Sequence, residues 1–191
     1  MAIDRRQQIL EAATKSFTLF GYKATTMDQI AKLANVGKGT IYTFFTNKEQ
    51  LFQLIVQDLI AEMKQVAEQQ FAKYPTFPEQ AHAALISILE YRKKHQFMMK
   101  LIEEEKEMGT PAVVEMAHEI EEAIVSYIKG TVDEAAKKGE IHTFDSEVAA
   151  FLMYKMYISL ISDWERNHEP LEKGEIAEIF RQMFIKGLSI K

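Results

Sequence analysis

The sequence of 191 residues contains no cysteine and only four prolines, and it has no apolar run long enough to span a membrane. The lack of cysteine excludes disulfides, cysteine-ligated zinc fingers and thiol catalysis. The first residues do not have the pattern of a signal peptide. Because 47% of the residues are apolar and 27% are charged, we expect a folded, soluble protein of the cytoplasm.

Strand-like alternation of apolar and polar residues is also missing, whereas apolar residues recur throughout at helical spacing. The prolines, at positions 75, 78, 111 and 170, fall between these periodic segments. We therefore predict an all-α fold of about nine helices. The expected helices span residues 4–20, 26–34, 37–45, 47–73, 79–94, 97–108, 112–138 and 145–168, with a last one after residue 170.

Charge is unevenly distributed along the chain. The first 50 residues hold seven lysines and arginines against four acids, whereas the remaining 141 hold 16 against 24. The net charge of −5 for the whole chain argues against a nucleic-acid partner. A small basic region on an acidic body is nevertheless typical of a compact unit that neutralises DNA phosphates.

Residues 26–45 have the pattern of two short helices joined by a tight turn, a helix-turn-helix. Thr26 and Gln29 have the spacing of a capping box, which predicts that the first helix starts there. Asn35 tolerates the left-handed backbone with which a helix ends, and Gly37 suits the N-cap of the next helix. The outer face of that second helix is suited to a DNA major groove.

The first 50 residues combine this pattern with others in a fixed order. The combination comprises segments 9–13, 20–22, 25–26, 30–31, 39–42 and 47–49, together with Phe17, Ala34, Val36 and Phe45. It resembles the DNA-binding domain of TetR-family transcriptional regulators. The resemblance implies a three-helix DNA-binding domain with the helix-turn-helix over residues 1–47. Residues 48–191 would then form a larger helical domain for effector binding and dimerisation.

The resemblance also implies which residues meet DNA. Residues at the start of the second helix of the motif would read base edges, and residues that flank it would hold phosphates. The base-reading candidates are Lys38, Thr40 and Thr43, with Gly39 allowing close approach, and the phosphate-binding candidates are Thr25, Thr26, Tyr42 and Lys48. Because a dimer presents two such helices, the expected partner is a near-palindromic double-stranded operator.

The rest of the chain is rich in methionine and aromatic residues, which suit an adaptable apolar pocket but are equally typical of ordinary core packing. The resemblance favours a pocket for a small apolar or amphipathic effector. Our candidates for its lining are Phe97, Met98, Met116, Phe151, Tyr154, Lys155, Tyr157 and Trp164. Lys155 could hold an anionic ligand group or pair with an acid of the protein. The basic run 92–95 is expected to close a helix.

Residues 148–161 contain a single charged residue, Lys155, so a helix there must be covered on several sides. The final helix has an apolar stripe made of Ile176, Ile179, Phe180, Met183, Phe184, Gly187 and Leu188. Two such neighbours bear more apolar surface than one small domain usually hides. We therefore predict a homodimer through these two helices, paired as a four-helix bundle.

The predicted function is a sequence-specific DNA-binding transcriptional regulator, a repressor released from a palindromic operator by its effector. We expect no enzymatic activity, no cofactor and no membrane partner, because no P-loop, dinucleotide fingerprint or Ser/His/Asp arrangement is present. One alternative is a ligand-independent DNA-binding protein. Another is a helical di-iron carboxylate enzyme, whose Glu-x-x-His spacing occurs three times. The pairs are Glu79 with His82, Glu115 with His118, and Glu165 with His168.

Overall fold

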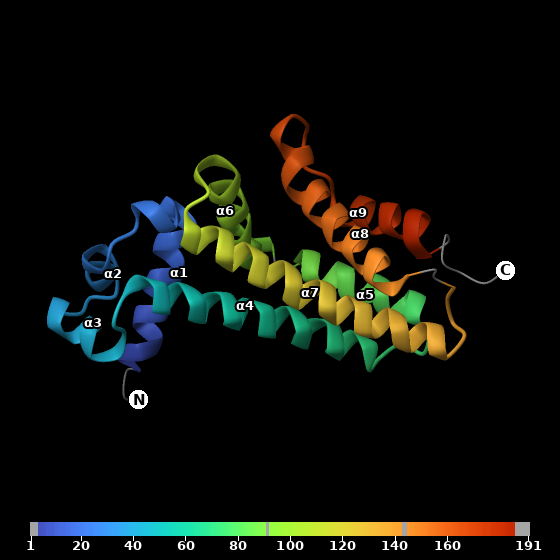
Figure 1. The fold of residues 1–191 in the computed structure, drawn as a ribbon, viewed down its shortest axis with the longest axis horizontal. Coiled ribbons are helices and arrows are strands. Elements are labelled where there is room, and N and C mark those ends of the chain that lie inside the picture. The colour runs from blue at the N-terminus through green and yellow to red at the C-terminus, as the bar shows by residue number, and fades with distance from the viewer. Residues whose placement is uncertain (1–3, 91, 143–144, 186–191) are drawn as a thin grey trace. The chain divides into compact units, whose positions relative to one another are not determined.

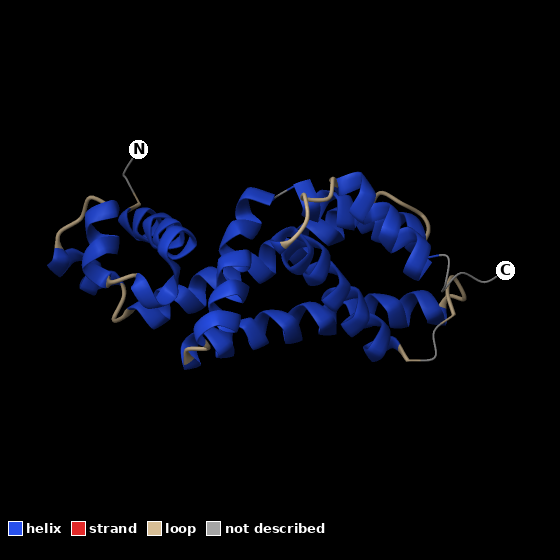
Figure 2. Ribbon diagram, turned by 90° about the horizontal axis from the view of Figure 1, so that it is seen from above, coloured by secondary structure: helices blue, strands red, loops and turns tan. Residues whose placement is uncertain are grey.

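The computed structural model describes residues 4–90, 92–142 and 145–185, and every regular element in these ranges is a helix (Figures 1 and 2). The predicted all-α fold is confirmed. The helices of the described residues are α1 (Arg5–Ala24), α2 (Met27–Leu33), α3 (Lys38–Phe44), α4 (Lys48–Phe71), α5 (Phe77–Glu90), α6 (Arg92–Met108), α7 (Pro111–Lys137), α8 (Ser146–Ile158) and α9 (Lys173–Phe180).

The chain divides into two compact units. The first unit comprises residues 1–59 and 93–120, and the second unit comprises residues 60–92 and 121–191. Helices α4 and α7 therefore each contribute residues to both units. We expect the boundary between the DNA-binding and effector-binding domains after residue 47. This boundary is not the one between the two compact units, and it stays a prediction.

The N-terminal helix starts and breaks where its sequence predicts. Asp4 caps α1 by accepting hydrogen bonds from the backbone N–H groups of Arg6 and Gln7 at 3.0 and 3.3 Å. At Gly21 the backbone leaves the helical conformation with a φ of 80°, which a residue with a Cβ rarely adopts. One further turn ends at Ala24, and the chain then enters α2.

Helices α2 and α3 form the helix-turn-helix, and its local signals are confirmed. Thr26 and Gln29 make the capping box at the start of α2. Asn35 in the turn has a φ of 52°, and Gly37 is the extended N-cap of α3. Because Ile41 is fully buried, α3 is anchored by one face and leaves the other to solvent.

Aromatic rings fill the core of the first unit. Phe17, Tyr22 and Phe52 lie with ring centroids 4.5 to 5.7 Å apart. Phe97 of α6 adds an edge-to-face contact with Phe52 at 5.7 Å. Each pair of this kind contributes about 0.5–1.5 kcal/mol beyond the area that it buries. Helix α6 therefore shares an aromatic core with α1 and α4.

A buried carboxylate on α6 holds the end of α1. Glu104 is 3% exposed, and its two oxygens accept hydrogen bonds from the backbone N–H groups of Tyr22 and Lys23 at 2.6 and 2.7 Å. A Cβ on Gly21 would lie 2.6 Å from Glu104 Oε2, so the glycine also makes room for the carboxylate. Charge-assisted hydrogen bonds of this length offset much of the cost of burying the charge.

Lys48, the first residue of α4, holds the same segment by its carbonyl groups. Its amine donates to the backbone oxygens of Tyr22 and Thr25 at 3.0 and 3.1 Å and lies 4.2 Å from the centroid of the Tyr22 ring. The Tyr22 hydroxyl donates to Glu49 at 2.7 Å, and this bond lowers the pKa of Glu49. Burial, followed by the same bond, raises the pKa of Tyr22.

In the second unit, α5 packs against α9, and a separate apolar cluster joins α5 to the end of α7. The buried members of that cluster are Phe77, Val132, Ala135 and Ile141. Asp145 caps α8 as predicted, by accepting hydrogen bonds from the N–H groups of Glu147 and Val148 at 2.8 and 3.0 Å. Helices α8 and α9 thus belong to the unit in which we expect dimerisation.

Two predicted boundaries are wrong. Helix α6 begins at Arg92, so the basic run 92–95 opens a helix instead of closing one, and no glycine or proline marks this change. The long helix expected over 145–168 changes at Ser159 to a π-helical turn, and a similar turn follows α9 from Arg181. Gly187 and Leu188 of the predicted final stripe lie outside the described residues.

The bond network at Glu104 predicts the effect of Glu104→Gln. We expect the free energy of unfolding to fall by about 1–3 kcal/mol, because an amide offers one acceptor where the carboxylate offers two. Urea unfolding followed by circular dichroism measures the change. Glu107→Gln, at an exposed position of the same helix, should stay within about 0.5 kcal/mol of the parent. Equal losses in the two variants would show that Glu104 does not fix the end of α1.

Candidate nucleic-acid interface and ligand pocket

The outer face of α3 presents the residues that the sequence assigns to base reading. Lys38 is exposed, and its amine lies 3.0 Å from both carboxylate oxygens of Asp28 in α2. This hydrogen bond, followed by the Coulomb attraction of Asp28, raises the pKa of Lys38. The two side chains are 68% and 53% exposed, so water and ions compete with the pair. Lys38 is therefore an exposed positive charge, and another acceptor can displace Asp28 from it.

Gly39 is not required by the fold. A Cβ built on it meets no atom within 4 Å, and its φ is not in the left-handed region. The structure thus contains no internal reason for glycine at this exposed helical position, where glycine costs about 0.5–1 kcal/mol relative to alanine. Thr40 beside it is half-buried, and the hydroxyl of Thr43 donates to Thr40 O at 2.7 Å.

The four candidates for phosphate binding have different surroundings. Tyr42 is 46% exposed and Thr26 is exposed. Thr25 is a correction, because it is fully buried and its hydroxyl donates to Gly21 O at 2.8 Å and is bonded to Ser16 Oγ at 3.0 Å. With its hydroxyl engaged inside the protein, Thr25 has no group free for a phosphate.

Lys48 has a structural role that the sequence does not reveal. Two donors of its ammonium group are engaged by Tyr22 O and Thr25 O, as described above. An ammonium group has three donors, so one is left for a phosphate. Lys48 therefore stays among the predicted phosphate contacts, but its replacement would also loosen the segment that enters α2.

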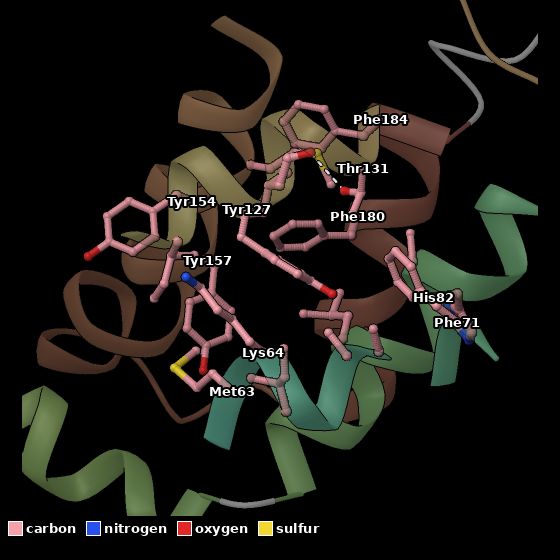
Figure 3. Close-up of a pocket in the computed structure, with 18 of the residues that line it drawn as sticks. Met63, Lys64, Phe71, His82, Tyr127, Thr131, Tyr154, Tyr157, Phe180 and Phe184 are labelled. Carbon is pink, nitrogen blue, oxygen red and sulfur yellow. Dashed lines mark hydrogen bonds between the residues drawn. The ribbon is translucent and has the colours of Figure 1, made fainter. Parts of the chain in front are cut away.

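The second unit contains an apolar pocket with a cavity of about 130 Å³ (Figure 3). Helices α4, α5, α7, α8 and α9 and the turn after α9 all contribute to its wall. Most lining side chains are aliphatic or aromatic. They include Met63, Phe71, Phe77, Leu85, Ile88, Ile124, Tyr127, Ile128, Met153, Tyr154, Tyr157, Phe180 and Phe184, with Lys64, His82 and Thr131 as the other polar members.

Of the eight predicted pocket residues, Tyr154 and Tyr157 line the cavity. The others do not. Phe97, Met98 and Met116 are buried in the first unit. Phe151 and Trp164 are 42% and 39% exposed, and Trp164 stacks on His168. Lys155 pairs with Glu121 at 2.6 Å, which is the structural alternative considered for it.

Sequence reasoning missed the contributions of α4, α5 and α7 to the pocket, such as Met63, Lys64, His82 and Tyr127. No sequence signal separates a side chain that lines a cavity from one that packs against a neighbour, because both lie on the apolar face of an amphipathic helix. Only the positions of the other helices decide the difference. Glu104 was missed for the same reason.

The Glu-x-x-His pairs do not converge. Glu115 and His118 are exposed on α7, His82 lines the pocket, and His168 stacks on Trp164 beyond α8. Across residues 4–90, 92–142 and 145–185 no group of three or more His, Cys, Asp or Glu side chains has the geometry to hold a metal ion. A di-iron centre requires such a group, so the described residues do not support one.

Among the helices of the described ranges, none is both long enough and apolar enough to cross a membrane.

Comparison with known proteins agrees with this geometry. Residues 9–55 match the model for the bacterial regulatory proteins of the tetR family. An uncharacterized HTH-type transcriptional regulator of Bacillus subtilis (strain 168), YhgD, is 54% identical over 189 residues, which cover 99% of each chain. The fold is similar to that of the fatty acid degradation regulator FadR from Bacillus halodurans, with a TM-score of 0.81, 17% identity and coverage of 98% and 97% of the two chains.

A second solved structure, the SmeT–triclosan complex, has a TM-score of 0.82 at 19% identity and covers 98% of this chain and 92% of the other. These two likenesses concern the fold. The family follows from the matched N-terminal model and from the relative that is 54% identical over nearly the whole chain. The protein is therefore a sequence-specific DNA-binding transcriptional regulator, and it belongs to the TetR family.

Proposed function

We propose that the protein is a homodimeric repressor, released from a palindromic operator when a small apolar or amphipathic molecule occupies the pocket of the second unit. The observation that carries this proposal is the course of α4. Lys48 at its start bonds the segment that leads into α2, whereas Met63, Lys64 and Phe71 of the same helix line the pocket. A ligand that alters the second half of an uninterrupted helix also acts on the first half.

On DNA, we propose that Lys38, Thr40 and Thr43 face base edges and that Gly39 allows the backbone to approach them. Thr26, Tyr42 and Lys48 would hold phosphates. The open space around Gly39 and the exposure of Lys38 support this arrangement. Lys38 would exchange Asp28 for a guanine edge, to which lysine is a suitable donor.

For dimerisation, we propose the outer faces of α8 and the segment after α9. Large apolar side chains are exposed there, where a monomer would leave them in water. They are Val148, Phe151, Leu152 and Met183, with exposed fractions of 40% to 68%. Contacts with the same side chains of a second copy would exclude water from them and would form the predicted four-helix bundle.

Two further parts of the proposal rest on the family. Its members are transcriptional regulators, so we infer that this chain has no enzymatic activity and acts in the cytoplasm. Of two structural neighbours, one is a complex with triclosan, an apolar molecule, and the other is named as a regulator of fatty acid degradation. We infer an effector of the same general kind here.

Gly39→Ala tests the reading face of α3. The methyl group meets nothing in the free protein, so we expect stability to be unchanged or to rise by about 0.5–1 kcal/mol. Affinity for an operator selected from random duplexes should fall about tenfold, because the methyl takes the space of a base edge. Fluorescence anisotropy measures the binding. Gly130→Ala in α7, which also meets nothing within 4 Å, is the control: its stability should respond as that of Gly39→Ala does, and its operator affinity should not change. Full operator affinity in Gly39→Ala would contradict the proposed interface.

Leu152→Glu tests the dimer interface. Leu152 is 49% exposed in one chain, so the new carboxylate is tolerated in the monomer but is buried without a partner in the dimer. We expect sedimentation equilibrium to show a shift towards monomer. Met108→Glu in α6, at 50% exposure, is the matched control and should leave the dimer intact. If the dimer is as stable in Leu152→Glu as in Met108→Glu, the outer face of α8 is not the dimer interface.

Ala81→Phe tests whether the pocket controls DNA binding. Ala81 is a half-buried residue of the pocket wall, so a phenyl ring there fills part of the cavity. Octanoate and triclosan serve as probes. For a probe that releases the operator from the parent protein, we expect release from Ala81→Phe to require about a tenfold higher probe concentration. Ala72→Phe, at an exposed position beyond α4, should respond as the parent does. Equal responses of Ala81→Phe and parent would contradict control by this pocket.

A further inference from the structure

The wall of the pocket carries charge of one sign. Among the described residues that line it, Lys64 is the lone member with a permanent charge, and none is an aspartate or glutamate. An ammonium group beside apolar side chains favours an anion and disfavours a cation, since the local dielectric constant is lower than that of water. The lining is therefore not electrostatically neutral towards a ligand, and the acids that act on it, Glu68 and Glu134 near Tyr127, lie outside the lining.

Lys64 also differs from four lysines of the described structure that are paired with acids. Lys100, Lys129, Lys155 and Lys173 each pair with an acid at 2.6 to 2.8 Å. Within the described residues Lys64 forms no hydrogen bond or ion pair, although Glu68 lies one turn further along α4. A half-buried ammonium group without a partner loses hydration that nothing in the protein replaces.

Two other polar groups of the wall lack protein partners in the described ranges. Nδ1 of His82 is buried and has no hydrogen bond, and the hydroxyl of Tyr127 has none either. Burial raises the pKa of Tyr127, so the phenol stays a neutral donor. Figure 3 shows Lys64 towards the Tyr157 side of the pocket and His82 towards the Phe71 side. The wall thus offers polar contacts at separate points around an apolar interior.

The volume limits the size of the occupant. The cavity of about 130 Å³ is close to an engineered apolar cavity of about 150 Å³ that takes up benzene. It is smaller than common ligand sites, which begin at about 300 Å³. A single ring or a short chain therefore fits this state, and longer chains require displacement of flexible side chains such as Met63 and Met153.

From the charge, the unpartnered donors and the volume, we propose that the pocket selects a small amphiphile with one anionic head, which lies against Lys64 while a short apolar chain or ring fills the cavity. This inference rests on the proposed function in one respect, namely that this pocket is the effector site. It adds the sign of the ligand's charge and the residue that recognises it.

Three probes of equal chain length test the sign of the charge: octanoate, octanol and octyltrimethylammonium. Calorimetric titration of the full-length protein should show that octanoate binds about tenfold more tightly than octanol, the scale expected for a charge-assisted hydrogen bond. Octyltrimethylammonium should bind more weakly than octanol. Octanol binding as tightly as octanoate, or the cation binding best, would overturn the inference.

Lys64→Met assigns the effect to one residue, because methionine keeps the apolar stem and removes the charge. We expect this variant to bind octanol as the parent does and to lose the preference for octanoate. Lys73→Met, at an exposed position after the end of α4, should keep the full preference. A preference that survives in Lys64→Met would show that another group holds the anion, and the inference would fail.

The same samples distinguish this inference from the proposed function when operator DNA is added. Octanoate that binds through Lys64 without lowering operator affinity contradicts release by the pocket and leaves the ligand chemistry standing. If all three probes release the operator equally well, the proposed function is supported and the inferred preference for an anionic head is contradicted. If none of the three probes binds the parent protein, the inferred chain-and-head ligand is wrong, whatever releases the DNA.

Discussion

The hold of Glu104 on the end of α1 is the interaction on which the first unit depends. Its carboxylate takes the N–H groups of Tyr22 and Lys23, while the Lys48 ammonium takes the carbonyl groups of Tyr22 and Thr25. A short peptide segment is thus held by opposite charges on its two kinds of polar group. Since this segment leads directly into α2, its position fixes where the helix-turn-helix begins. The aromatic core then secures α1, α4 and α6 around it.

For the proposed control by a ligand, this arrangement suggests a route through α4. The two charges that hold the segment come from α6 and α4, and α4 continues into the wall of the pocket. A ligand shifts an equilibrium only by its difference in affinity for the two states. The required difference exists if the occupied pocket favours a position of α4 in which Lys48 and Glu104 no longer hold the segment together. In the proposed function neither residue would need to contact the ligand, because α4 itself would transmit the change.

Local signals predicted the helix-turn-helix well. The capping box at Thr26, the left-handed Asn35 and the N-cap Gly37 each depend on neighbours within a few residues, so the sequence contains the whole cause. The pocket could not be read in the same way. Phe97 and Met98 have the composition expected of a lining but are core residues of the first unit, whereas Lys64 resembles an ordinary surface lysine until the other helices are in place. Likewise, nothing in the run of glutamates 103–105 marks Glu104 as the buried one.

The pair of Lys38 and Asp28 bears on specificity rather than stability. Non-specific affinity for DNA grows with the number of phosphates that a protein neutralises. With Asp28 beside it, Lys38 adds little to that general attraction, and the basic excess of the first 50 residues is already small. A single head would therefore hold random DNA weakly. If Lys38 reads a base edge as proposed, it would gain from leaving Asp28 only where that edge offers acceptors in the right positions, and the acid would then raise the contrast between an operator and other DNA. Such a head would need a second copy to reach useful affinity, and the proposed dimer surface on α8 and the segment after α9 would supply one.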